Sequence, residues 1–251
     1  MVDFVHLSRE DMLRKVEPLL RNGYFIREED GKIDCVRKLN WETPWVHVKH
    51  GNKDCHYLHR VLFEHIFERK LVPSACQECW KVVVSPKTVK GLVAMLELLR
   101  KLDKPSKCGM EVFRRNTPNR YGAYVYNDSL EEGRACYKIV RRMVDEHPDL
   151  GSETKVILKR GCTEFEQAVG PSDKWRVTEE QREMERIAEE IFVVRKGEEL
   201  QTCQPYHLIT HVMREWLIAA WQIGDESYLH FTGGEPMFKP VVTYHEGGQN
   251  G

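Results

Sequence analysis

The stretch WKVVVSPKTVKGLVAMLELL, residues 80–99, decides the fold that the sequence predicts. It opens with a tryptophan and three valines around a single lysine, residue types that are enriched in buried strands. Pro86 interrupts the strand, and apolar residues then recur at helical spacing from Val89 to Leu99. A strand followed directly by an apolar-faced helix is the first half of a βαβ unit.

The following segments extend this unit to the order strand, helix, strand, strand, helix, strand. Residues 107–113 and 121–127 have the composition of a second and a third strand. Ser129 with Glu132 forms a capping box that opens a second helix, and residues 155–160 supply the fourth strand. This order is the ferredoxin-like split βαβ arrangement, so the sequence predicts an α+β fold.

Helical segments flank this core on both sides. Before it, the pattern predicts a capped helix, a hairpin and a second helix in residues 1–70. The ferredoxin-like core with a cysteine site occupies residues 71–170. After it, residues 171–251 form a C-terminal helical segment and a tail that packs on the core.

The overall composition excludes several classes of protein. There are 38 basic and 39 acidic residues, a net charge of −1, so the chain lacks the basic excess of nucleic-acid-binding proteins. No apolar run approaches the length of a transmembrane helix, and the N-terminus contains acids rather than the apolar region of a secretory signal. We therefore expect a cytoplasmic protein without a membrane or nucleic-acid partner.

Cysteine is abundant in this chain. A reducing cytoplasm disfavours disulfides, so some of the thiols are expected to pack as small apolar groups and others to bind a metal. The eight cysteines are Cys35, Cys55, Cys76, Cys79, Cys108, Cys136, Cys162 and Cys203.

Four of these cysteines fall on one edge of the predicted sheet. Cys76 and Cys79 precede the first strand, Cys108 begins the second, and Cys162 follows the fourth. In the split arrangement those three strand ends share an edge, and neighbouring strands lie about 4.8 Å apart. The sequence therefore predicts a four-thiolate metal site whose sulfurs lie within about 7 Å of one another.

The spacing favours an iron–sulfur cluster of the 4Fe-4S type over zinc. Structural zinc often uses two CxxC pairs, whereas this chain offers one pair and two single cysteines. Zinc and a metal-free pair of thiols remain alternatives. A thioredoxin-type dithiol is disfavoured, because that motif follows a strand and opens a helix, whereas Cys76 and Cys79 precede a strand.

Histidines in residues 55–68 offer a further possible ligand. His56, His59 and His65 lie on an expected helix, and one of them could replace a cysteine. A helix with partly exposed histidines is the interpretation that we favour.

Charged residues surround Cys162 in the stretch LKRGCTEFE. Lys159 and Arg160 would attract an anionic substrate, and Glu164 and Glu166 could transfer protons, so these four are the candidate catalytic residues. A solvated strand end with ordinary ion pairs is an equal alternative. Because side chains alternate along a strand, Lys159 and Arg160 should point to opposite faces of the sheet.

Together these features predict an iron–sulfur enzyme or redox protein that acts on a small anionic substrate or exchanges electrons with a partner. Four thiolate ligands would close the site for electron transfer or a structural role, whereas three would leave an iron open to substrate. The alternative is a zinc-stabilised binding module without catalytic activity. The sequence decides neither the substrate nor whether the chain is an enzyme.

Overall fold

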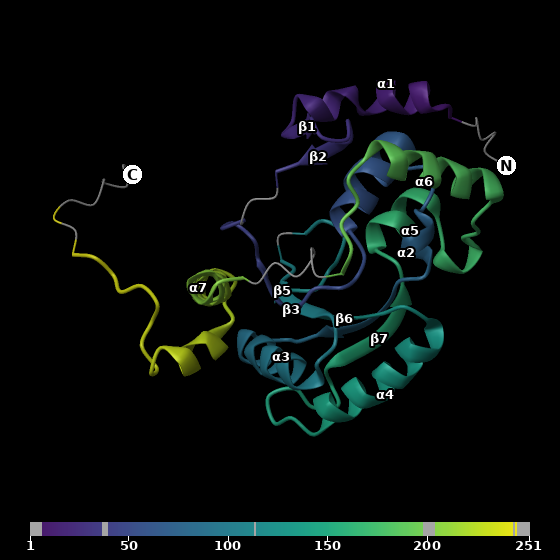
Figure 1. Cartoon of the computed structure of the whole chain (residues 1–251). Coiled ribbons are helices and arrows are strands. Elements are labelled where there is room, and N and C mark those ends of the chain that lie inside the picture. Colours follow the sequence, from purple (N-terminus) through teal and green to yellow (C-terminus); the bar gives the residue numbers. More distant parts are fainter. Residues whose placement is uncertain (1–6, 37–39, 113, 198–203, 243, 245–251) are drawn as a thin grey trace, which may run out of the picture.

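The structure is a computed structural model, and it describes residues 7–36, 40–112, 114–197, 204–242 and 244 (Figure 1). The strands are β1 (Tyr24–Ile26), β2 (Ile33–Cys35), β3 (Trp45–Lys49), β4 (Trp80–Ser85), β5 (Ser106–Met110), β6 (Tyr121–Asn127) and β7 (Lys155–Arg160). The α-helices are α1 (Arg9–Leu20), α2 (Ser74–Gln77), α3 (Val89–Leu102), α4 (Leu130–Asp145), α5 (Thr163–Val169), α6 (Glu179–Ile191) and α7 (Tyr206–Gln222). Other helical segments are η1 (Tyr57–Ile66), η2 (Ser172–Lys174) and η4 (Glu226–Phe231).

The central sheet has five strands in the order β3-β5-β6-β4-β7, and every neighbouring pair is antiparallel. The α+β class predicted from the sequence is therefore confirmed. All four predicted core strands are present, although β5 ends at Met110 and not at residue 113. The edge strand β3 was not predicted. It follows Pro44 directly and pairs with β5 over a bulge between His47 and Lys49.

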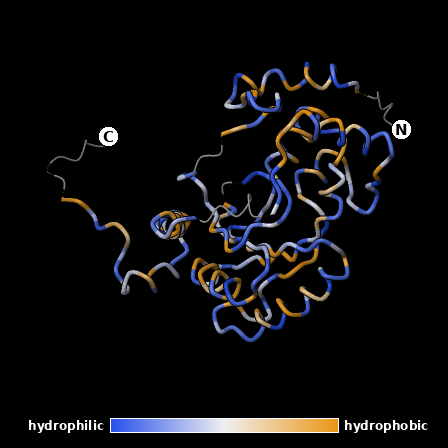
Figure 2. The backbone as a smooth tube through the Cα atoms, viewed as in Figure 1, coloured by the Kyte–Doolittle hydropathy of each residue, from blue (hydrophilic) through white to orange (hydrophobic). Residues whose placement is uncertain are grey.

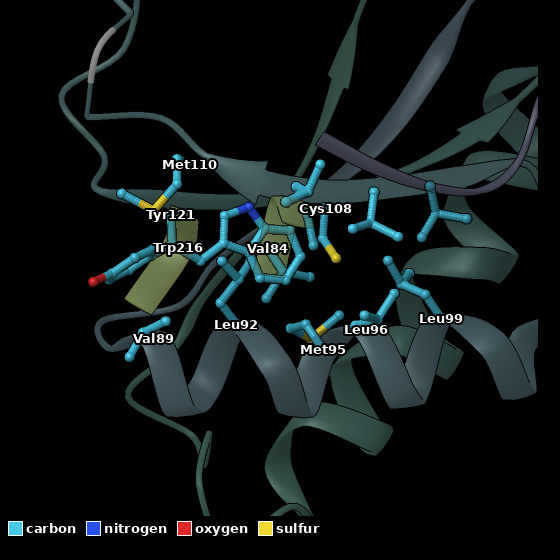
Figure 3. Close-up of a cluster of buried hydrophobic side chains, with 14 of the residues drawn as sticks. Val84, Val89, Leu92, Met95, Leu96, Leu99, Cys108, Met110, Tyr121 and Trp216 are labelled. Carbon is cyan, nitrogen blue, oxygen red and sulfur yellow. The ribbon is translucent and has the colours of Figure 1, made fainter. Parts of the chain in front are cut away.

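One face of the sheet is covered by α3 and α4, which lie below the strands in Figure 1. Apolar residues of β4, α3 and α7 fill the space between them, and Figure 2 shows the hydrophobic stretch in α3. This first core contains Val82, Val84, Leu92, Met95 and the fully buried Trp216, most of which are seen in Figure 3. It fixes which residues of each strand point away from α3 and α4.

A second core lies in the part of the chain formed by α1, β1, β2, η1, α5 and α6. Its buried side chains include Met12, Phe63, Phe165, Trp175 and Met184. It therefore draws on each of the three segments that the sequence predicts. Cys108 and Cys136 are buried in the first core, whereas Cys76 is buried in the second core and Cys162 packs against it.

The helix expected in residues 55–68 is a π-helix, η1. It begins where the Asp54 carboxylate accepts a hydrogen bond from the Tyr57 backbone N–H at 3.1 Å. It ends before Glu68 and Arg69, whose φ angles of 48° and 63° are in the left-handed region. π-Helices are rare and occur often at functional sites, and η1 carries His59.

Among the helices in the described part of the chain, none combines the length and the apolar character needed to cross a membrane.

Candidate thiolate site

The Cys162 sulfur lies where three elements meet. Cys162 follows β7 and is the N-terminal cap residue of α5. Its Sγ is 2.7 Å from Nζ of Lys81 on β4 and 3.3 Å from Nε2 of His59 on η1. The ring of His59 stacks on Phe165 of α5 at 4.5 Å between centroids, which orients the imidazole. A thiol, an ammonium group and an imidazole are thus held in contact.

Lys81 faces this site because of its place in β4. Val82 and Val84 point into the first core. Because successive side chains of a strand point to opposite faces, Lys81 points to the other face of the sheet. The lysine is only 7% exposed, and in the described part of the chain no carboxylate pairs with it. A buried ammonium requires an anionic or hydrogen-bonding partner, and Cys162 supplies one.

The pKa values of the pair follow from this contact. Burial by itself would raise the pKa of Cys162, but the Lys81 ammonium and the hydrogen bond from His59 lower it to about 6. Burial opposes the charge on Lys81, yet the Cys162 thiolate raises the pKa of Lys81 well above its usual value. The contact therefore favours the thiolate form of Cys162 and the ammonium form of Lys81.

Three further cysteines bear on Cys162 through the backbone or through charge. The Gly161 N–H donates to the Cys79 carbonyl at 2.7 Å, and the Cys79 N–H donates to the Cys76 carbonyl at 3.3 Å. The CxxC turn thus lies directly against the residue before Cys162. Cys55, four residues before His59, is an exposed residue overall. Burial of its sulfur, and then the charge of Cys162, raises the pKa of the Cys55 thiol.

The charges of these thiols affect one another. Burial is the main cause of the raised pKa of Cys76, and the thiolate charges of Cys162, Cys55 and Cys79 raise it further. We call Cys55, Cys76, Cys79 and Cys162 the thiol cluster. Within the residues that the structure describes, no three or more His, Cys, Asp or Glu side chains are arranged to hold a metal ion.

Cys108 lies apart from the thiol cluster, contrary to the shared edge expected from the sequence. It is fully buried in the first core and points towards α3, next to Met95 and Leu96 (Figure 3). The reason is alternation: β5 begins at Ser106, so Lys107 points to the thiolate face and Cys108 to the α3 face. The structure therefore brings Cys76, Cys79 and Cys162 together, adds Cys55, and separates Cys108 from them.

The four charged candidates around Cys162 have different partners. Lys159 is opposite Lys81 in the sheet and donates to Thr163 Oγ1 at 2.8 Å, with Glu166 Oε2 at 3.6 Å. Arg160 has contacts elsewhere, since its Nε donates to the Gln77 carbonyl at 2.5 Å. This is the difference that strand alternation predicts. Lys159 is the inward residue, and Arg160 ties β7 to the CxxC turn.

Glu164 belongs to a separate ion-pair network. Its carboxylate pairs with Arg114, which also contacts the buried Glu111 at 3.3 Å. Burial would raise the pKa of Glu164, but a backbone hydrogen bond and Arg114 lower it below its usual value. Glu164 is therefore an ionised carboxylate held by Arg114, a residue that was not predicted at this site.

Lys107 was also missed by the sequence analysis. Its Nζ lies 4.3 Å from the centroid of the Trp45 ring and 5.9 Å from that of Tyr124. Burial, then the nearby charge of Lys81, lowers the pKa of Lys107 to about 8. As with Lys81, no carboxylate pairs with it in the described ranges. The available sequence signal was a lysine inside an apolar strand, which Lys81 shows most clearly in WKVVV.

No protein-family model, curated protein or solved structure matches this chain.

Proposed function

We propose that this chain is a redox protein that holds an iron–sulfur cluster through Cys55, Cys76, Cys79 and Cys162. The observation that carries the proposal is the CxxC turn beside Cys162, whose sulfur contacts a buried lysine that has no carboxylate partner in the described residues. Cysteine thiolates are the standard ligands of such clusters. Four ligands close the site, which suits electron transfer.

The charges around the thiol cluster support an anionic centre. Lys81 and Lys107 lie on the same face of the sheet, and the charge of Lys81 lowers the pKa of Lys107. Two buried ammonium groups would repel one another unless a negative group lay between or beside them. An iron core bound by four thiolates carries net negative charge, which these lysines would offset.

A cluster and a single zinc ion place different demands on the thiols. The four thiols alter one another's pKa, and the described residues contain no group of three or more His, Cys, Asp or Glu side chains that could hold a metal ion as they stand. A cluster separates its ligating sulfurs more widely than a tetrahedral zinc ion does, because irons and sulfides lie between them. A zinc-stabilised binding module is the alternative.

A ferredoxin-like core would carry this centre. Its support is the order β5-β6-β4-β7, with α3 connecting β4 to β5 and α4 connecting β6 to β7. In that arrangement the thiol cluster is on the sheet face opposite α3 and α4.

Metal analysis after anaerobic purification tests the proposal. We expect iron and acid-labile sulfide together with a broad visible absorption. Serine substitutions of Cys55, Cys76, Cys79 or Cys162 should each lower the iron content, and Cys108→Ala is the matched control that should retain it. A colourless protein that contains zinc would support the binding module. Iron loss in a folded Cys108→Ala variant would contradict this ligand set.

The contact between Lys81 and Cys162 supports a second candidate function, a metal-free enzyme with a thiolate nucleophile. Lys159, the inward lysine of the sheet edge, would then attract a small anionic substrate, and Glu166 at 3.6 Å from Lys159 would transfer a proton. Purification without oxygen distinguishes the two. A metal-free protein in which iodoacetamide alkylates Cys162 faster than the other cysteines would favour the enzyme.

A further inference from the structure

We infer that Lys81 and Cys162 are a covalent modification site, at which dioxygen joins Nζ and Sγ through one oxygen atom. The product is an Nζ–O–Sγ bridge between β4 and the residue that caps α5. This inference goes beyond the proposed function and does not rest on it, because it concerns the chain without a metal. A metal bound to Cys162 would occupy the sulfur and prevent the bridge.

The two atoms lie close together for a nitrogen and a sulfur. Nζ of Lys81 and Sγ of Cys162 are 2.7 Å apart, whereas an N–H···O hydrogen bond is about 2.9–3.0 Å long. Sulfur is larger than oxygen, so a hydrogen bond that ends on a thiolate should be longer still. A single oxygen atom that is bonded to both atoms at a bent angle spans this separation, whereas a larger bridging group does not fit.

Both residues are held in place by their surroundings. Lys81 is 7% exposed and lies on β4, which is hydrogen-bonded to a strand on each side. The Gly161 N–H donates to the Cys79 carbonyl at 2.7 Å, which fixes the backbone beside Cys162. Groups that are held together in this way react as parts of one molecule, at an effective concentration far above that of two free groups.

The contacts also select this lysine among its neighbours. Lys159 donates to Thr163 Oγ1 at 2.8 Å, and Lys107 lies against the ring of Trp45. Lys81, by contrast, donates to a sulfur. We therefore expect oxidation to join Lys81, and neither of the other two lysines, to the thiolate.

The sulfur is in the form that oxidants attack. The thiolate, and not the thiol, is the reactive form of cysteine. The Lys81 ammonium stabilises the thiolate of Cys162, and His59 Nε2 lies 3.3 Å from the same sulfur. The pair therefore presents an oxidisable sulfur and a nitrogen to the same oxygen atom.

The step balances with dioxygen as the only co-reactant. One oxygen atom bonds to both Nζ and Sγ, the O–O bond breaks, and the other oxygen leaves as water with two of the three hydrogens of the ammonium. Nitrogen and sulfur each give up two electrons, which are the four that dioxygen accepts. A thiol reductant reverses the step, because four electrons and four protons return the amine and the thiol and release the bridging oxygen as water.

The test is mass spectrometry of the full chain, which is kept in air-saturated buffer with a chelator, alkylated with iodoacetamide and digested with trypsin. We expect a joined pair of peptides, residues 71–87, uncut at Lys81, and residues 161–174. The pair should contain one oxygen atom more and two hydrogen atoms fewer than the two peptides together. Treatment with dithiothreitol before alkylation should abolish the pair.

Four variants separate this bridge from other oxidation products. Lys81→Met and Lys81→Arg remove the primary amine, and Arg keeps the charge, so neither should form the pair and both should leave Cys162 open to iodoacetamide. Lys107→Met and Cys79→Ser are the matched controls, which remove a neighbouring lysine and a neighbouring thiol and should still form it. Circular dichroism checks that each variant is folded.

Three results would overturn the inference. The first is the absence of a joined pair from the unchanged chain after exposure to air. The second is a pair that has lost two hydrogens without gaining oxygen, which is a disulfide between Cys162 and the CxxC turn or a direct bond from nitrogen to sulfur. The third is oxygen gained on Cys162 with no lysine joined, which is a sulfenic acid. Iron in the purified chain would bear on the proposed function alone, because the exposure to air follows its removal.

Discussion

Replacement of Cys162 by alanine in the reduced, metal-free protein tests the central pair at the thiolate site. In the structure the Cys162 sulfur is the partner of Lys81 Nζ at 2.7 Å, and Lys81 is 7% exposed. Cys162→Ala therefore leaves an ammonium group buried without an anion. Removal of one partner from a buried ion pair costs about 3–5 kcal/mol. Because Cys162 itself is only half-buried, we expect a loss of about 2–3 kcal/mol in the free energy of unfolding.

The coupling between the two residues is the sharper quantity. Lys81→Met with Cys162→Ala removes both charges and leaves an apolar pair, so the double variant should be more stable than Cys162→Ala alone. The assay is urea denaturation at pH 7.5 with a chelator and a reductant, in which the midpoint reports stability when the slope is constant. Cys108→Ala serves as the control for loss of a buried sulfur, at about 1 kcal/mol.

Additive single effects, or a Cys162→Ala cost no larger than that of Cys108→Ala, would refute the reasoning. Either result would mean that the thiolate does not stabilise the buried ammonium.

Three further predictions concern other parts of the chain. Cys136 is 1% exposed in the first core, so Cys136→Ala should cost about 1 kcal/mol in urea denaturation and leave the metal content unchanged; metal loss would contradict its role as core packing. A Cβ on Gly109 would meet the Pro44 carbonyl oxygen at 2.1 Å, so Gly109→Ala should lower the free energy of unfolding by about 1–3 kcal/mol. Gly51→Ala is the control, because its nearest contact is at 3.9 Å and its stability should change little. Equal urea midpoints for the two variants would show that β3 moves without cost to accommodate the methyl group. Burial lowers the pKa of His47 to about 3, so as the pH falls the unfolded chain binds a proton at His47 before the folded chain does. The stability that is present above pH 6.5 is therefore lost as the pH falls towards 3. His47→Gln should flatten this part of the stability–pH curve, and an unchanged slope would contradict the prediction.

Local sequence patterns were enough to identify most of the helices and strands. Apolar runs define β4, β6 and β7, and Ser129 caps α4 by accepting a hydrogen bond from the Glu132 N–H at 3.1 Å. These signals are local because strand alternation, helical spacing and caps depend on residues a few positions apart. For the same reason the short β3 and α5 were missed, since a stretch of five or seven residues gives little periodicity.

The sequence predicted that Cys76, Cys79 and Cys162 share one edge of the sheet. Cys76 and Cys79 lie beside the end of β7 because Trp80 pairs with Arg160, a consequence of the strand order. Cys108 lies away from that edge, because it pairs with Ala123, which in turn pairs with Val84, four residues along β4 from Trp80. The register of β5 also turns Cys108 to the α3 face. A shift of one residue turns a side chain to the other face, and no pattern within residues 107–113 distinguishes the two.

Only the tertiary structure supplied the partners that give Cys162 its chemistry. His59 and Cys55 come from a helical segment more than a hundred residues before Cys162. Lys81 comes from β4, the strand that pairs with β7. Their approach depends on the second core, where Phe63 of η1 packs against Phe165 of α5 with ring centroids 4.6 Å apart. Such contacts are fixed by the complementary shapes of side chains distant in sequence, so local periodicity carries no record of them.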